Sequence, residues 1–282
     1  MAKTADEVLY DMEVVRPLVL QLLDEGLVLV ESPHEDGKKP HHRFYMSKTT
    51  VSQALWKALM GANPSVYPWD DPNESKRYPV DDVFLEDCLA FIRILNDRPE
   101  VRERRLEFQL PQRAKWRFAS RAGGKSYQSG KHVCAKKGIR FEEAAWYKGN
   151  PSHFPVTLPD PDLEAKVVSP YVPPILKIGA DGLKKEDGDE DQTGIPGPRP
   201  MGILKENGFH LHDIFGNLWE WTLEDNATQG ELWGGSWADG PEDCTWLPRK
   251  ELPKRGDGVT GLRLVAVRKA GRHPAAGGKS GA

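Results

Sequence analysis

Two acidic residues, Asp213 and Glu220, lie inside a strongly apolar stretch that runs from Asn207 to Trp221 and reads NGFHLHDIFGNLWEW. Two glycines interrupt the stretch, which disfavours a regular helix. A buried carboxylate needs a cation or several N–H donors as partners. The pattern therefore indicates a loop wrapped around a hard metal ion. The alternative is that both carboxylates cap backbone N–H groups without an ion.

The cysteines and the GGSW serine offer a second kind of chemistry. The three cysteines are Cys88, Cys134 and Cys244, and no CxxC spacing occurs. An odd number without that spacing predicts neither a disulfide framework nor a zinc site, and it favours a reducing compartment. Cys88 falls on the apolar side of a predicted helix, so we expect it to fill the core. Ser236 does not follow the strand–Ser–helix pattern of a nucleophile elbow.

Composition limits the function classes. The chain has 282 residues and a net charge of −3, which gives no general electrostatic case for nucleic acid or anionic membrane. The N-terminus carries acids where a signal peptide needs a basic and then an apolar run, and no apolar stretch reaches membrane-spanning length. We therefore expect a soluble protein that is cytoplasmic or virion-associated, with no membrane or evident nucleic-acid partner.

The elements that must position these residues are short and separated by turns. The 27 Gly and 23 Pro residues favour an irregular, loop-rich fold over a helical bundle. Apolar spacing predicts an amphipathic helix over residues 5–24, with Gly26 after its end. The other predicted elements are strands Leu27–Val30 and Phe44–Thr50 and helices Val51–Leu59, Leu85–Asn96 and Leu110–Gly124.

Composition also divides the chain. Residues 1–42 are predicted to form an N-terminal helical extension, and residues 43–268 the main domain. Within that domain, residues 159–200 are acidic and Pro-rich, which is typical of an exposed insertion. Residues 269–282 read as a disordered tail.

Several segments, in order, resemble the formylglycine-generating enzyme or sulfatase-modifying factor domain family, and the resemblance covers about residues 43–268. This family implies an α+β fold of the C-type-lectin-like type, with short antiparallel strands, a few helices and long structured loops. The N-terminus departs from the family pattern: the usual glycine-rich opening hairpin looks absent, and a helix is expected in its place. The segments are FYMSKTTVSQALWKALMGANPS, YPVDDVFLEDCLAFIRILN, LPQRAKWRFASRAGG, FEEAAWYKGN, NGFHLHDIFGNLWEW, GGSW and GLRLV.

The resemblance also implies where catalysis would occur. Catalytic members oxidise a cysteine of a client sulfatase with two copper-binding cysteines, five residues apart, just after the GGS motif. Cys244 stands at the second position and Asp239 at the first. Because copper(I) prefers thiolates, we expect copper and the oxidase chemistry to be absent. Cys244 is the remaining catalytic candidate, or else a small residue packed under a loop.

The family has two other branches that bear on this chain. The carbon–sulfur bond-forming branch needs an iron site on an additional helical domain, for which the N-terminal segment is too short. The variable proteins of diversity-generating retroelements are non-catalytic, and they display a ligand-binding surface between GGSW and the terminal strand.

By that similarity, residues 237–260 are predicted to bind a protein or other macromolecule. Aromatic and Arg residues dominate binding hot spots, so Trp246 and Arg249 are the expected anchors. The alternatives are ordinary surface loops, or a structural or regulatory subunit that docks through the N-terminal helix and the acidic insertion. The candidate ligand-binding residues are Trp237, Asp239, Glu242, Thr245, Trp246, Arg249 and Lys250.

In relatives, the segment that matches DIFGNLWEW wraps calcium. Carried onto this chain, the implied ligands are the side chains of Asp213 and Glu220 and the carbonyls of Gly216 and Leu218. Ligation by oxygen alone suits Ca²⁺ rather than a transition metal. A structural calcium ion is therefore the cofactor that the resemblance implies.

Overall fold

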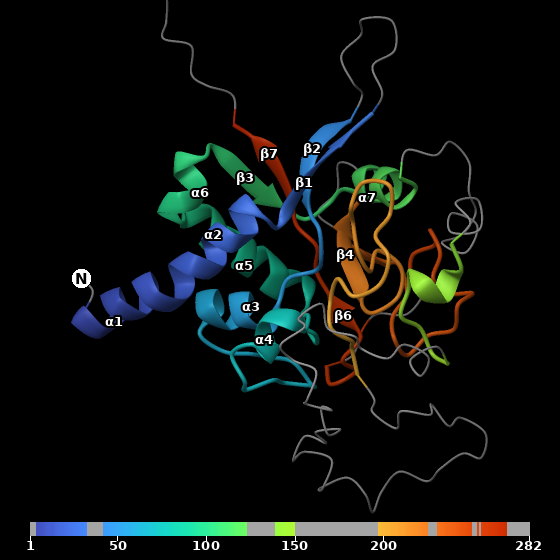
Figure 1. Cartoon of the computed structure of the whole chain (residues 1–282), viewed down its shortest axis with the longest axis horizontal. Coiled ribbons are helices and arrows are strands. Elements are labelled where there is room, and N and C mark those ends of the chain that lie inside the picture. The colour runs from blue at the N-terminus through green and yellow to red at the C-terminus, as the bar shows by residue number, and fades with distance from the viewer. Residues whose placement is uncertain are drawn as a thin grey trace, which may run out of the picture.

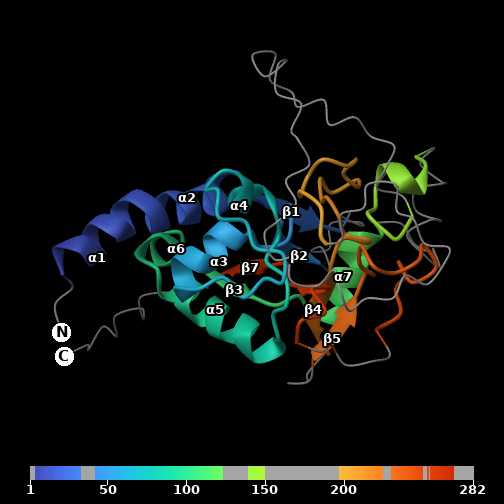
Figure 2. The ribbon, with the colours of Figure 1, turned by 90° about the horizontal axis from the view of Figure 1, so that it is seen from below.

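A computed structural model describes residues 4–32, 42–122, 139–149, 197–224, 230–249, 253 and 255–269. These residues form two sheets and a set of short helices, which is an α+β architecture. Helices α1 to α6 gather on one side of the molecule, and α7 lies with the second sheet on the other side (Figures 1 and 2).

The chain begins with one helical rod in three parts: α1 (Ala5–Tyr10), a π-helical turn η1 (Asp11–Val15) and α2 (Arg16–Asp24). Thr4 and Glu7 form a capping box at its start. Pro17, which has no N–H to donate, lies just after the π turn, in the first turn of α2. The helix predicted for residues 5–24 is therefore observed, with a π turn in its middle.

The larger sheet has the strand order β1-β2-β7-β3, and all its neighbours are antiparallel. β1 (Leu27–Glu31) pairs with β2 (Arg43–Ser47) along its whole length. The expectation that the opening hairpin is missing is therefore wrong, because the two strands form one. This pairing also spans the boundary predicted between residues 42 and 43. The remaining strands are β7 (Val265–Arg268) and β3 (Leu106–Gln109).

Local signals explain the middle helices. α3 (Gln53–Met60) begins after Ser52, whose side-chain oxygen accepts a hydrogen bond from the Leu55 N–H at 3.2 Å. It ends at Gly61, which has a φ of +82°. α5 (Leu85–Asp97) matches its prediction within one residue. The others are α4 (Glu74–Arg77), α6 (Pro99–Glu103) and α7 (Arg113–Ser120).

The second sheet has the order β5-β4-β6 and sits against an aromatic core. β4 (Trp219–Leu223) is antiparallel to β5 (Gly230–Trp233) and parallel to β6 (Thr260–Gly261). A short 3-10 helix, η2 (Phe141–Glu143), lies nearby in the same cluster of buried residues. The large aromatic side chains buried in that core are Phe44, Trp116, Phe141, Phe215, Trp233 and Trp246.

Some predicted features lie outside the described residues. They are Cys134, Lys250, residues 159–196 of the acidic insertion and residues 270–282 of the tail. Among the residues that are described, no helix is both long and apolar enough to cross a membrane.

Candidate functional site

A fully buried ion pair, Glu220 with Arg263, lies at the centre of the predicted metal loop. Arg263 donates from Nη2 to Glu220 Oε1 at 2.7 Å, and from Nε to both carboxylate oxygens at 2.9 and 3.1 Å. Trp116 donates its indole N–H to Glu220 Oε2 at 2.7 Å. Each carboxylate oxygen therefore has two N–H donors, which satisfies the charge in the absence of water.

Arg263 also ties together three segments that are far apart in the sequence. Its Nη1 donates to the carbonyls of Ser47 at 3.0 Å and Lys48 at 2.7 Å, where β2 ends. Its Nη2 donates to the carbonyl of His212 at 2.7 Å, in the loop before β4. Sequence reasoning quoted Arg263 only as part of GLRLV. The available signal was the one charged residue of the apolar segment GLRLV, an arginine, which is a natural partner for an acid in the other apolar run.

The calcium ligand set does not fit this geometry at Glu220. Both oxygens of Glu220 already accept N–H groups, and a second cation there would face the guanidinium of Arg263. The Gly216 carbonyl accepts the Leu218 N–H at 2.8 Å. Across the described part of the chain, no group of three or more His, Cys, Asp and Glu side chains could hold a metal ion. These contacts leave calcium binding itself untested. Glu220 is satisfied by side-chain N–H groups of Arg263 and Trp116 and not by the backbone N–H groups of the alternative.

Asp213 is the other carboxylate of that loop, and it is less well satisfied. It is buried with a φ of +51°, and its Oδ2 accepts the Gly202 N–H at 2.8 Å. Its Oδ1 has no donor within the described residues. Burial raises the pKa of Asp213, and the neighbouring His212 and Arg263 oppose that rise.

Asp239 stands where catalytic relatives have their first cysteine, and it holds the GGSW loop in place. Its Oδ2 accepts the indole N–H of Trp219 at 2.7 Å and the hydroxyl of Ser236. Its carbonyl accepts the Lys148 N–H at 2.8 Å. These bonds make Asp239 an anchor of the loop. Ser236 is buried beneath it, in agreement with the sequence argument against a nucleophilic serine.

Cys244 is completely buried, with its Sγ 3.8 Å from the Gly240 carbonyl. A Cβ on Gly235 would lie 2.8 Å from this sulfur, so only glycine leaves room for the thiol. Burial, and after it the charges of Asp239 and Asp243, raise the pKa of Cys244 well above its ordinary value. A thiol in such a place is poorly nucleophilic. The structure therefore supports the packing role over the catalytic one.

Trp246 is a core residue, which corrects its prediction as an exposed anchor. Its side chain is 6% exposed, and its indole N–H donates to Ser120 Oγ at 2.8 Å. The guanidinium of Arg121 lies 4.6 Å from its ring centroid. Trp237 is half-buried, with its indole N–H bonded to the Gly258 carbonyl at 3.0 Å and its ring against Tyr67. A buried tryptophan and an exposed one look alike in a sequence.

Four exposed residues of the same segment, Glu242, Asp243, Leu247 and Pro248, lie next to the buried anchors, and we call them the rim; Ala238, Arg255 and Gly256 are exposed as well. Leu247 is 68% exposed, more than any other large apolar residue described. It was missed because a lone leucine in a Pro-rich stretch carries no pattern.

The remaining predicted contact residues border the rim. Thr245 accepts the Leu247 N–H on its hydroxyl at 3.2 Å. Arg249 is half-buried, and its Nη1 lies 3.4 Å from Asp257 Oδ2. Its N–H donates to the Leu232 carbonyl of β5 at 2.8 Å. These bonds connect the backbone beside Leu247 to the second sheet.

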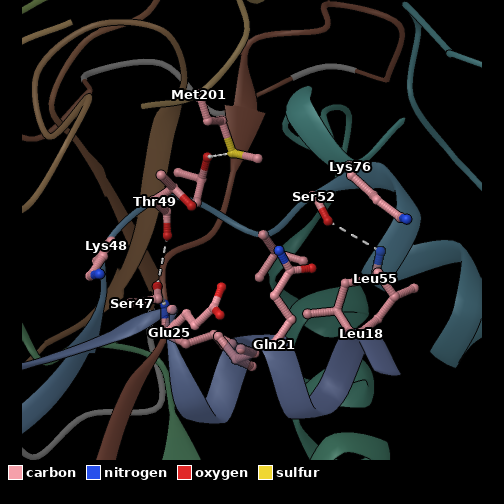
Figure 3. Close-up of a pocket in the computed structure, with 15 residues that line it drawn as sticks. Leu18, Gln21, Glu25, Ser47, Lys48, Thr49, Ser52, Leu55, Lys76 and Met201 are labelled. Atoms are coloured by element: carbon pink, nitrogen blue, oxygen red, sulfur yellow. Dashed lines mark hydrogen bonds between the residues drawn. The ribbon is translucent and has the colours of Figure 1, made fainter. Parts of the chain in front are cut away.

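A cavity of about 330 Å³ lies away from all the predicted site residues. Figure 3 shows Leu18 and Gln21 of α2 on one side of it and Met201 on the other. Two of the hydroxyls that line it bond within the protein: Ser47 Oγ donates to the Thr49 carbonyl, and Thr50 Oγ1 donates to the Met201 sulfur. The cavity is thus a gap in the packing between α2 and the connection from β2 to α3.

Comparisons with known proteins agree with this architecture. A family model, described as sulfatase-modifying factor enzyme 1-like domain, matches residues 21–173 and 177–268. No curated protein matches the sequence.

Three solved structures are similar at low identity. Treponema denticola variable protein 1 is 18% identical with a TM-score of 0.49, and the match covers 86% of this chain and 93% of that one. CarF is 16% identical with a TM-score of 0.48, covering 86% and 97%. PvdO from Pseudomonas aeruginosa is 14% identical with a TM-score of 0.47, covering 86% and 91%.

Proposed function

Because the chain belongs to the family with the sulfatase-modifying factor enzyme 1-like domain, we propose that it uses this scaffold to bind a protein or other macromolecular ligand. Binding would involve the surface of residues 237–260 and no redox chemistry at Cys244. The α+β fold expected from the family is confirmed, whereas the binding role is an inference from the geometry of this surface.

The observation that carries the proposal is the alternation of buried anchors and exposed residues along the segment. Asp239, Cys244 and Trp246 hold the backbone against the second sheet and the aromatic core. The rim lies between and beyond these anchors. A loop fixed in this way loses little conformational entropy when a ligand binds, which favours affinity.

The rim also indicates the chemistry of the ligand. It combines one strongly exposed apolar side chain, Leu247, with the carboxylates of Glu242 and Asp243. A complementary surface would offer an apolar contact flanked by basic groups or N–H donors.

The oxidase alternative lacks the groups that it needs. Asp239 replaces one thiol and is occupied by Trp219 and Ser236, and Cys244 is buried with a raised pKa. A copper(I) titration tests this directly. We expect no tight binding that depends on Cys244, and tight binding lost in Cys244→Ala would revive the oxidase.

Photo-crosslinking tests the binding role. A benzophenone amino acid replaces Leu247 in the full chain expressed in its source cells. The matched control carries it at Ile94 of α5, another exposed apolar position, which is 40% exposed. We expect one dominant adduct at position 247 that is absent at position 94. Equal adducts at both positions, or none at 247, would refute the proposal.

A further inference from the structure

The first helical rod carries a concentration of exposed apolar side chains. Of the ten exposed large hydrophobic residues among those described, five fall within residues 8–14. Their exposed fractions run from 37% to 57%. Figures 1 and 2 both show α1 extending beyond the rest of the molecule. We call this set the N-terminal patch; its members are Val8, Leu9, Tyr10, Met12 and Val14.

The second half of the rod is fixed to the body of the protein. Val15, Val19 and Leu23 are buried in the larger core. At the π turn, Arg98 donates from Nη1 and Nη2 to the two oxygens of Asp11 at 2.5 and 3.2 Å. This two-point ion pair sets the direction in which the first half projects.

The projecting half has features of a preorganised docking element. The capping box of Thr4 and Glu7 closes its N-terminus. An isolated helix of this length would be marginal in water, but here it continues a helix that packs on the core. An apolar patch presented on such a support is typical of a protein interaction site.

The charges around the patch identify the class of partner. Residues 4–15 contain no Lys or Arg and four acids, Asp6, Glu7, Asp11 and Glu13, of which Asp11 is paired with Arg98. A membrane-surface helix needs basic residues to meet anionic lipid, so this segment is ill suited to a bilayer. Two copies packed along α1 would bring the acids of one copy close to those of the other. A partner with apolar residues flanked by Lys and Arg complements both the patch and its charge.

We propose that the N-terminal patch docks a partner protein through an amphipathic helical segment with basic flanks. This surface is separate from the rim and needs neither Leu247 nor Cys244. The two surfaces together would let the protein join a ligand to a second protein.

The test uses a synthetic probe and the full-length chain. A fluorescent amphipathic helix of Leu and Lys is titrated with the protein, and anisotropy reports binding. Two matched peptides serve as controls: one with Glu in place of Lys, and one with the same Leu and Lys residues scrambled so that no apolar face forms. We expect the first peptide to bind at least about tenfold more tightly than either control.

Variants that keep the charge locate the site. Leu9→Gln and Met12→Gln, together, should weaken the Leu–Lys peptide at least about tenfold, with circular dichroism unchanged. Ile94→Gln and Leu89→Gln, at two exposed apolar positions of α5, should leave its affinity unchanged. Equal binding of the scrambled peptide, or equal loss in the control variants, would overturn the proposal.

Two other occupants are outcomes of the same series. Sedimentation that shows a dimer dissolved by Met12→Gln would mean that a second copy covers the patch. Flotation with lipid vesicles that is lost in Met12→Gln would mean a membrane instead. Either result contradicts a basic protein partner.

Discussion

Replacing Glu220 with Gln is the sharpest way to perturb the centre of the fold. The two side chains have nearly the same shape, so Glu220→Gln removes charge without leaving a cavity. The change leaves the guanidinium of Arg263, which is 0% exposed, without its counter-ion. Either orientation of the new amide also turns its NH₂ group toward an N–H donor, from Arg263 or from Trp116.

The expected cost follows from these contacts. Removing one partner of a buried ion pair destabilises a protein by about 3–5 kcal/mol, because the other charge stays buried and uncompensated. The carbonyls of Ser47, Lys48 and His212 still accept from Arg263, so the fold should survive. We therefore expect Glu220→Gln to remain folded but to lose about 3–5 kcal/mol of its free energy of unfolding.

Urea unfolding followed by tryptophan fluorescence measures this loss, and the control is an exposed acid on the rim, Glu242→Gln. The same titrations with EDTA and with added calcium test the metal prediction. Since Glu220 is satisfied by N–H donors, we expect wild-type stability to be indifferent to EDTA. A loss below about 1 kcal/mol in Glu220→Gln would refute the ion-pair reasoning. If EDTA lowered the stability of the wild type but not that of Glu220→Gln, the prediction of a calcium site at Glu220 would be supported instead.

Three further predictions concern Asp81, the buried thiols and Trp246. Burial raises the pKa of Asp81 to about 7, so the folded state holds a proton that the unfolded state releases above about pH 4. The free energy of unfolding should therefore fall by at most about 4 kcal/mol as pH rises from about 4 to about 7. In urea titrations across that range, Asp81→Asn should show a flatter dependence on pH than the wild type. Parallel pH profiles for the two proteins would contradict this prediction. In a Cys134→Ser background, the buried Cys88 and Cys244 should react with a thiol reagent only when the protein unfolds, and fast labelling of Cys244 in the native protein would count against its packing role. Trp246→Ala should cost about 3–5 kcal/mol in urea unfolding, as a core truncation does, and a change below about 1 kcal/mol would mean that its burial is unimportant.

Local signals made the helices predictable. The spacing of apolar residues, the Ser52 cap and the Gly61 stop define α3 within two residues of its predicted bounds. α7 is shorter than predicted, since it begins only at Arg113, after Leu110 and Pro111. Both strands of the β1–β2 hairpin were predicted from local signals, and what was missed is that residues 27–31 pair with residues 43–47.

The candidate site was harder to predict because it depends on contacts distant in sequence. The sequence placed Glu220 correctly in a buried, partner-demanding position. It could not distinguish an ion from Arg263, which lies 43 residues away. Likewise, Trp246 is buried by Ser120 and Phe215, which belong to other segments. Residue types alone cannot separate such a core tryptophan from a binding hot spot.

The affinity of the partner recovered by crosslinking at position 247 tests the central claim most directly. The purified partner is titrated against wild-type protein, Leu247→Asp, Cys244→Ala and the control Ile94→Asp. We expect Leu247→Asp to weaken Kd by at least about tenfold, while Cys244→Ala and Ile94→Asp leave it unchanged. Binding that is lost in Cys244→Ala and indifferent to Leu247→Asp would contradict a thiol-independent binding surface.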